Sequence, residues 1–235
     1  MNYRKTLWAL GFVGAATCAW LGAADPPAAP GGGGAGDVNQ ADLKPASNDL
    51  LEKVQTELHK MVSLEADFDE EVYPKDRKNP MRFSGHLAAK KPNYVIWNVT
   101  SPFRTAVLVQ AENLQMWDEG MPNGKVKAIN LAGNATYTAM AQQTRDWAGG
   151  NFKILSESYD VFMEKDKPLI LRFVPKARTG LKKTFSSVSV TLTDKYDCIR
   201  KIIYRKASGE VYVISLRDPK VNKPIPQDVW QIPPK

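Results

Sequence analysis

Residues 83–97 read FSGHLAAKKPNYVIW, and this stretch decides the fold. Two candidate strands, Met81–Ala89 and Tyr94–Val99, lie on either side of its basic, Pro-containing centre. Similar short apolar runs recur along the chain, roughly every ten residues, between turn signals such as Ser208-Gly209. This rhythm is typical of an antiparallel sheet or barrel.

The remaining elements are expected on both sides of this stretch. Leu51, Val54, Leu58 and Met61 recur at helical spacing, so Asn48–Val62 should form an amphipathic helix. Asp49 followed by Glu52 suggests a capping box at its start. A helical insertion is expected over Leu131–Trp147. Further strands are expected over Leu64–Tyr73, Thr105–Gln110, Leu114–Asp118, Lys125–Asn130, Phe152–Glu157, Tyr159–Glu164, Leu169–Val174, Phe185–Thr193, Ile199–Arg205 and Glu210–Leu216.

One helix, many strands and one helical insertion suggest a curved sheet wrapped on helices. The concave face of such a sheet can pack solid, or it can enclose an apolar ligand. Strand alternation alone fits both alternatives and favours the packed core.

The chain begins with features of a secretory signal peptide. Arg4 and Lys5 precede an uncharged run, Leu7–Ala24, which ends in small residues. We expect cleavage after Ala24 and export from the cytoplasm; an uncleaved anchor and lipidation at Cys18 are alternatives. Residues 25–47 are rich in Pro and Gly and should form a flexible linker to a folded domain at residues 48–235.

Composition excludes several classes of function. Of 235 residues, 43% are hydrophobic and 24% are charged, which excludes a collagen, a coiled-coil rod and a polytopic membrane protein. Two Cys and two His argue against a metal site or a cofactor held by such ligands, and no familiar catalytic motif occurs. We therefore expect that the protein is not an enzyme. The net charge of +7 comes from scattered lysines and arginines without interleaved aromatics, a poor footprint for nucleic acid.

An acidic cluster, Asp67, Asp69, Glu70 and Glu71, is the main concentration of carboxylates. Period-two spacing places Asp67, Asp69 and Glu71 on one face of the expected strand. Paired carboxylates can perform acid-base chemistry, but a solvated outer face is the simpler interpretation.

The stretch at residues 83–97 resembles the LolA family of periplasmic carriers of outer-membrane lipoproteins. The shared pattern is Gly-x-Leu, a basic residue before Pro, and an apolar strand ending in Trp. The resemblance continues through Ser101-Pro102 and the segments AVLV (106–109), LQMW (114–117), LRFVP (171–175) and VWQIPP (229–234). Together these motifs span Asn48 to Pro234.

The resemblance implies an α+β fold that is mainly β: an unclosed antiparallel barrel of about eleven strands with a helical lid over an apolar cavity. By position in the family pattern, Val95, Trp97, Val107, Val109, Leu114 and Met116 would line that cavity. Ordinary core packing remains the alternative for all six.

The resemblance also implies a gate at Lys91 and Pro92. In the family, the basic residue before this Pro bonds the lid shut when the carrier is empty. Pro92 biases Lys91 towards extended geometry, at the entrance of a strand. The family usually has Arg at this position, and Lys lacks its planar fork, so we expect a looser lid.

The function implied is a periplasmic chaperone that carries acylated lipoproteins from an inner-membrane ABC-type release complex to an outer-membrane acceptor, as a monomer. A LolA-like carrier or sensor of another lipid, such as a glycolipid or a fatty acyl chain, needs the same cavity. An anchored interaction domain is a third possibility. The basic charge could favour encounter with anionic membrane surfaces.

Overall fold

The computed structural model describes residues 43–233, except 77–78, 122–123, 134–137, 139–140, 143–145 and 148. The expected signal peptide, and the expected linker up to residue 42, lie outside the described residues. Its strands are β1 (Lys44–Pro45), β2 (Ser63–Tyr73), β3 (Met81–Lys90), β4 (Tyr94–Ser101), β5 (Thr105–Gln110), β6 (Asn113–Asp118), β7 (Lys127–Asn130), β8 (Tyr159–Lys165), β9 (Ile170–Pro175), β10 (Phe185–Leu192), β11 (Ile199–Lys206) and β12 (Val211–Val221). The helices are α2 (Asn48–His59) and α4 (Phe152–Ser158), with 3₁₀ turns η5 (Gly180–Lys183) and η6 (Gln227–Trp230).

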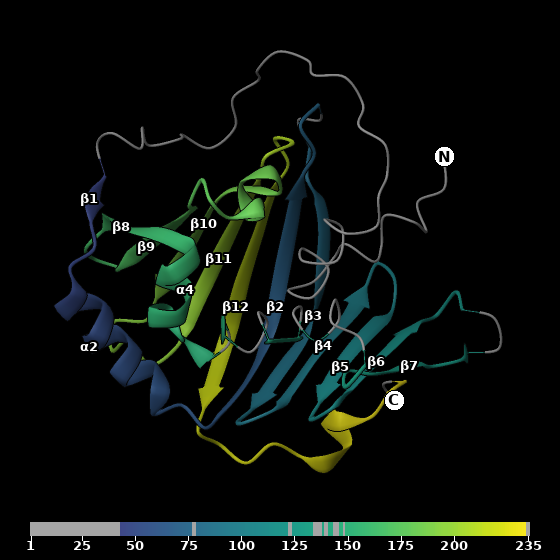
Figure 1. Ribbon diagram of the computed structural model, residues 1–235. Helices are drawn as coiled ribbons and strands as arrows, with labels where there is room; N and C mark the ends of the chain where they lie inside the picture. Colours follow the sequence, from purple (N-terminus) through teal and green to yellow (C-terminus); the bar gives the residue numbers. More distant parts are fainter. Residues whose placement is uncertain are drawn as a thin grey trace.

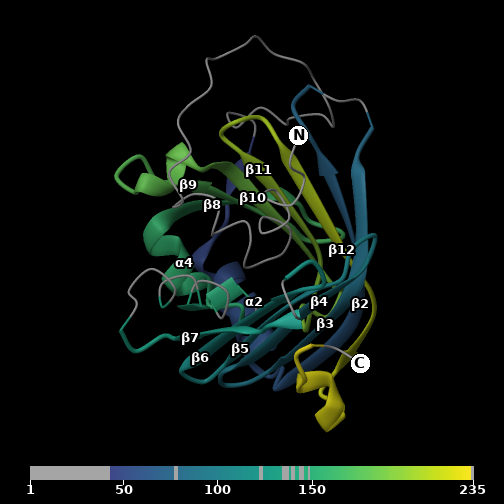
Figure 2. The same cartoon turned by 90° about the vertical axis from the view of Figure 1, so that its right-hand side faces the viewer.

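These strands form one antiparallel sheet of twelve strands, in the order β1-β8-β9-β10-β11-β12-β2-β3-β4-β5-β6-β7. The edge strands β1 and β7 do not pair with each other, so the sheet curves without closing (Figures 1 and 2). This confirms the predicted mainly-β, unclosed architecture, with a short strand added at one edge. That strand lies within the expected linker: Lys44 and Pro45 pair with Met163 and Phe162 of β8, so ordered structure begins before Asn48.

One predicted strand is wrong, because Phe152–Glu157 belongs to helix α4. Phe152 and Leu155 are its buried residues, three positions apart, which is helical rather than strand spacing. The Phe152 ring packs on Phe173 of β9, with ring centroids 5.2 Å apart. This tertiary contact overrides the β propensity of the aromatic and branched residues in the segment.

Helix α2 is slightly shorter than predicted and begins with a different cap. It ends at His59 rather than Val62, and Ser47 is its N-cap. The Ser47 hydroxyl accepts a hydrogen bond from the Leu50 amide at 3.2 Å, so Asp49 does not cap the helix as expected. Val54 and Leu58 are its buried residues.

Alternation along β2 separates an apolar inner face from a polar outer face. Phe68 is buried, whereas its neighbours Asp67 and Asp69 are exposed. Asp69 pairs with Arg217 at 2.8 Å, and Asp67 lies 3.2 Å from the His86 ring. The acidic cluster therefore forms a solvated outer face, apart from Glu70.

Gly85 explains why the Gly-x-Leu pattern matters at the centre of the sheet. A side chain at this position would collide with the Asn98 carbonyl oxygen and with the Phe68 ring. The ring of Phe68 lies against Trp97, with centroids 4.2 Å apart. The missing side chain therefore makes room for an aromatic pair on the concave face.

A small second core lies on the convex face of the sheet. Ala88, Ile96 and Leu108, from β3, β4 and β5, are fully buried there. Apolar residues of the C-terminal segment, Ile225, Val229, Trp230 and Ile232, cover them. This segment continues from β12 and crosses the outside of the sheet (Figure 2).

Glu70 is a buried carboxylic acid on the inner face. Its register partners are Phe83 on β3 and Ile214 on β12, and it is 1% exposed. Among the described residues, its Oε2 atom has no hydrogen-bond partner. Burial raises the pKa of Glu70 from an ordinary value of 4.5 to about 8. The carboxyl is therefore protonated at neutral pH.

This pKa predicts a specific pH dependence of stability. Between pH 5 and pH 8 the folded protein holds a proton on Glu70 that the unfolded chain has released. The free energy of unfolding should therefore fall as pH rises, by up to roughly 1.4 kcal/mol per pH unit from this group. The side chain introduced by Glu70→Gln cannot titrate. Urea unfolding between pH 5 and pH 8 should therefore show a smaller decrease of the free energy of unfolding with pH in this variant than in the wild type.

Glu71→Gln is the matched control. Hydrogen bonds from Tyr73 and Arg82 lower the pKa of Glu71, so it stays ionised above pH 5 in both states. The slope between pH 5 and pH 8 should be the same in this control as in the wild type. A wild-type slope equal to that of Glu70→Gln would show that Glu70 does not hold a proton in the folded state.

Candidate functional site

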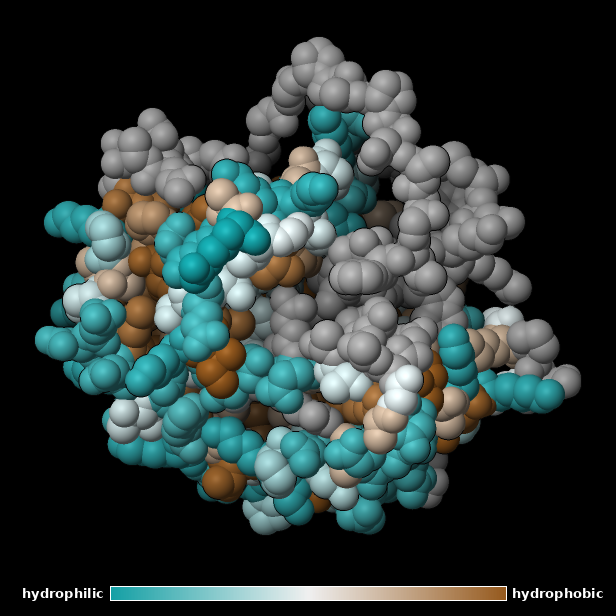
Figure 3. All heavy atoms as spheres, viewed as in Figure 1, coloured by the Kyte–Doolittle hydropathy of each residue, from teal (hydrophilic) through white to brown (hydrophobic). Residues whose placement is uncertain are grey.

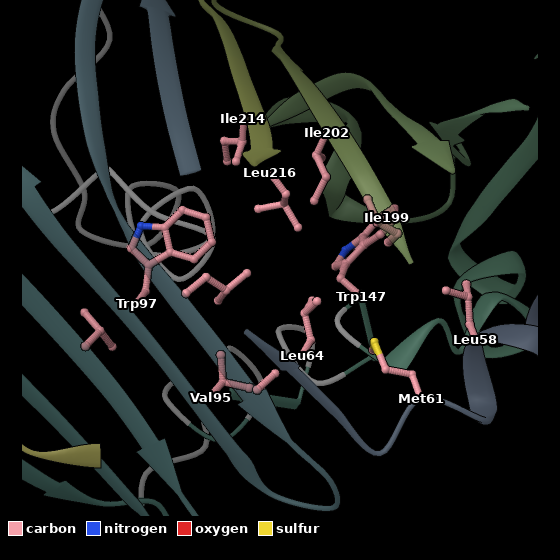
Figure 4. A pocket seen from close by; sticks show the side chains of 13 residues that line it. Leu58, Met61, Leu64, Val95, Trp97, Trp147, Ile199, Ile202, Ile214 and Leu216 are labelled. Atoms are coloured by element: carbon pink, nitrogen blue, oxygen red, sulfur yellow. The ribbon is translucent and has the colours of Figure 1, made fainter. Parts of the chain in front are cut away.

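An apolar cavity lies between the concave face of the sheet and the helical side of the molecule (Figure 4). Its wall is built from aliphatic and aromatic side chains of α2 and the residues that follow it, of six strands and of the segment before α4. They are Leu58, Met61, Leu64, Leu87, Ala89, Val95, Trp97, Val107, Trp147, Ile199, Ile202, Ile214 and Leu216. Nearly the whole wall is therefore hydrocarbon, which suits an apolar ligand.

The cavity is nearly closed in this conformation. The cavity and its mouth together enclose about 680 Å³ of space not filled by atoms. The volume that the centres of water molecules can occupy is about 50 Å³. Since one water needs roughly 10–15 Å³ on this measure, only a few waters would fit. A long ligand would require the surrounding elements to move apart.

Three of the six predicted lining residues lie on the cavity wall. Val95 and Trp97 extend from β4, and Val107 from β5 faces Trp97 across the strand pair. The other three, Val109, Leu114 and Met116, share this inner face but lie in the surrounding packed core. The structure thus divides the predicted set between wall and core.

The opposite wall comes from residues that the sequence analysis did not select. Ile199 and Ile202 lie on β11, and Ile214 and Leu216 on β12. Figure 4 shows these side chains facing Trp97 and Val95 across the cavity. Period-two alternation of Ile214 and Leu216 is visible in the sequence. What the sequence lacks is the curvature that brings β11 and β12 opposite β4.

Helices α2 and α4 and the segment preceding α4 form the lid of the cavity. The Leu58 side chain lies against Gly150, where an added Cβ would come within 2.5 Å of it. The rim of this contact is polar: the His59 ring lies 3.0 Å from Asn151 Oδ1. The Lys153 amide donates to Gln55 Oε1 at 2.9 Å. The two helices therefore share buried apolar core residues (Val54, Leu58, Phe152 and Leu155) and a few hydrogen bonds at the rim.

Lys91 connects this lid to the sheet. Its Nζ donates to the carbonyl oxygens of Leu58 at 3.3 Å and of His59 at 3.1 Å. These are the last carbonyls of α2, where the helix dipole favours a cation. Partial burial lowers the pKa of the Lys91 ammonium. Lys91 therefore binds the C-terminus of the lid helix from the turn between β3 and β4.

Lys91 and Pro92 also line a second, more open hollow beside the cavity. Its other residues are Met61, Val62, Ser63, Ala89, Lys90, Tyr94, Val95 and Gly149. Met61, Ala89 and Val95 belong to both hollows. The turn that carries Lys91 and Pro92 is therefore at the mouth of the apolar cavity, directly after β3.

The described part of the chain offers no clear site for metal binding or for thiol chemistry. There, no group of three or more His, Cys, Asp or Glu could hold a metal ion. Burial raises the pKa of the Cys198 thiol to about 12, so it is not a reactive thiolate. No helix among the described residues has the length and apolarity to cross a bilayer.

The chain is similar in sequence to known lipoprotein carrier proteins. The family model described as "Outer membrane lipoprotein carrier protein LolA" matches residues 59–233. An outer-membrane lipoprotein carrier protein of Pseudomonas putida (strain GB-1) is 24% identical over 130 residues, 55% of this chain and 56% of the relative. The match thus spans little more than half of that relative. The Yersinia pestis bv. Antiqua (strain Angola) protein of the same name is 25% identical over 158 residues, 66% of this chain and 70% of the relative.

Two solved structures match this chain at low sequence identity and with TM-scores below 0.5. A LolA superfamily protein from Nitrosomonas europaea is 14% identical, with a TM-score of 0.41 over 78% of this chain and 96% of that one. MucB in complex with MucA is 11% identical, with a TM-score of 0.44 over 79% of this chain and 59% of that one. The family model covers most of the described residues, and the chain therefore belongs to the LolA family, whose name describes a carrier.

Proposed function

We propose that this protein binds the acyl chains of lipoproteins in its cavity and carries them through the periplasm from the inner to the outer membrane. The observation that carries the proposal is the hydrocarbon wall closed by a helical lid. Burial of an acyl chain is worth about 0.8 kcal/mol per CH₂. A lipoprotein with several long chains therefore needs such a cavity to cross water.

The proposal includes the partners that such transport requires. An inner-membrane ABC-type complex would release the lipoprotein to this carrier, and an outer-membrane acceptor would take it. The carrier would act as a monomer, without cofactor or chemistry of its own. Family membership supports this part of the proposal.

The direct test is transfer of a real cargo. Purified protein should release a triacylated lipoprotein from inner-membrane vesicles, and mass spectrometry of the native complex should detect the bound lipoprotein. Recovery of a free glycolipid or fatty acid instead would assign the cavity to another lipid. Failure to bind any acylated species would contradict the carrier proposal.

The cavity itself can be tested by filling it. Val107→Phe adds volume at a partly buried wall position and should weaken binding of a fluorescent palmitoyl probe by about tenfold, a typical overpacking cost. Val161→Phe makes the same change at a partly buried position that is off the wall. It should leave the affinity unchanged, measured by fluorescence titration. Equal effects of both variants would place the probe elsewhere.

We also propose that the two bonds from Lys91 hold the lid closed when the cavity is empty. Lys91→Leu removes both bonds, so the palmitoyl probe should enter and leave faster. Lys91→Arg offers more donors to the same carbonyls and should slow exchange. In stopped-flow fluorescence, the probe should exchange fastest in Lys91→Leu, more slowly in the wild type and most slowly in Lys91→Arg. If Lys91→Leu changes neither uptake nor handover, Lys91 has no gating role.

A further inference from the structure

We propose that the rim around the cavity mouth docks directly on an anionic lipid bilayer. The rim comprises Lys60, Val62, Lys90, Lys91 and Lys223. This inference rests on the proposed carrier function, because it assigns the surface from which acyl chains pass into or out of the cavity.

Three separate parts of the chain meet at this rim. The end of α2, the turn between β3 and β4 and the start of the C-terminal segment lie together at the lower edge in Figure 1. The Asn222 side chain accepts from the Val62 amide at 2.7 Å and donates to the Lys60 carbonyl at 3.1 Å. The Ser63 hydroxyl donates to the Lys223 carbonyl at 2.8 Å, and the Lys91 amide donates to the Val62 carbonyl at 2.9 Å. Hydrogen bonds between the three segments therefore hold the rim together.

The rim carries four lysines, of which one has a carboxylate partner among the described residues. In the described part of the chain, Lys90, Lys91 and Lys223 form no ion pair. Lys60 is paired with Glu57 at 2.7 Å. Lys90 and Lys223 are exposed. Each lysine held near an anionic bilayer favours binding by about fivefold.

An exposed apolar side chain lies among these cations. Val62 is 58% exposed, although it sits between the buried Met61 and the start of β2. Viewed from the helical side, most of the surface is hydrophilic, with apolar side chains in separate patches (Figure 3). An apolar tip ringed by lysines matches the interface of a bilayer, where apolar atoms enter below anionic headgroups.

The rim borders the apolar cavity. The hollow lined by Val62, Lys90 and Lys91 shares Met61, Ala89 and Val95 with the cavity wall. A rim docked on a bilayer would therefore bring the cavity close to the membrane surface. An acidic protein surface would satisfy the lysines but would leave the exposed Val62 side chain unmatched, so the structure favours the bilayer.

The experiment is cosedimentation of the mature protein with vesicles. We expect binding to phosphatidylcholine vesicles that contain phosphatidylglycerol, loss of binding at high salt, and little binding to phosphatidylcholine alone. The double substitution Lys90→Glu and Lys223→Glu should weaken binding by tenfold or more. The same change at Lys182 and Lys183, exposed residues before β10 at the opposite end of the sheet, is the matched control and should have much less effect.

The apolar contribution has its own pair of variants. Val62→Asp should weaken binding to the anionic vesicles, whereas Ile154→Asp, at an equally exposed position on α4, should not. Absence of binding to anionic vesicles at low salt would overturn the proposal, as would equal losses from the rim variants and their controls. Circular dichroism spectra and melting temperatures close to those of the wild type would show that the rim variants are folded. Absence of palmitoyl-probe binding by the wild type would instead contradict the carrier function.

Discussion

The structure depends on the requirement that an unclosed sheet must cover its apolar concave face. In this molecule β1 and β7 stay apart, so the sheet cannot bury its inner face by closing into a barrel. Helices α2 and α4 supply the missing cover. A helix is too stiff and too broad to follow every hollow of a curved sheet, so space remains beneath it. The cavity follows from this mismatch between two regular elements.

The polar contacts of the lid can be exchanged at modest cost, whereas its buried side chains, such as Val54 and Phe152, anchor it in the core. Lys91 binds two terminal carbonyls of α2, and Gln55 and Asn151 join the helices. Each hydrogen bond contributes only about 0.5–1.5 kcal/mol net, because water can replace the partner. The sheet, in contrast, is held by continuous strand pairing and by Phe68, Trp97 and their buried neighbours. The polar bonds at the rim of the lid are therefore weaker than the pairing within the sheet.

Glu70 shows that strand alternation, rather than residue type, decides which side chains of β2 are buried. In the sequence it is one of several neighbouring carboxylates, and its neighbours are solvated as expected. Alternation alone turns its side chain to the inner face, between Phe83 and Ile214. Likewise, Val109 and Val107 have the same chemistry and the same strand face, yet only Val107 reaches the cavity wall.

The sequence by itself determined most strands, the amphipathic helix α2, the solvated acidic face and the positions of Lys91, Val95 and Trp97, because these follow from local periodicity and motif order. Only the tertiary structure decided that Phe152 begins a helix, that Ile199 and Ile214 face Trp97, and that Lys91 reaches the end of α2. Periodicity is a property of neighbours along the chain. Sheet curvature and helix placement depend on contacts between residues far apart in sequence, which no local pattern records.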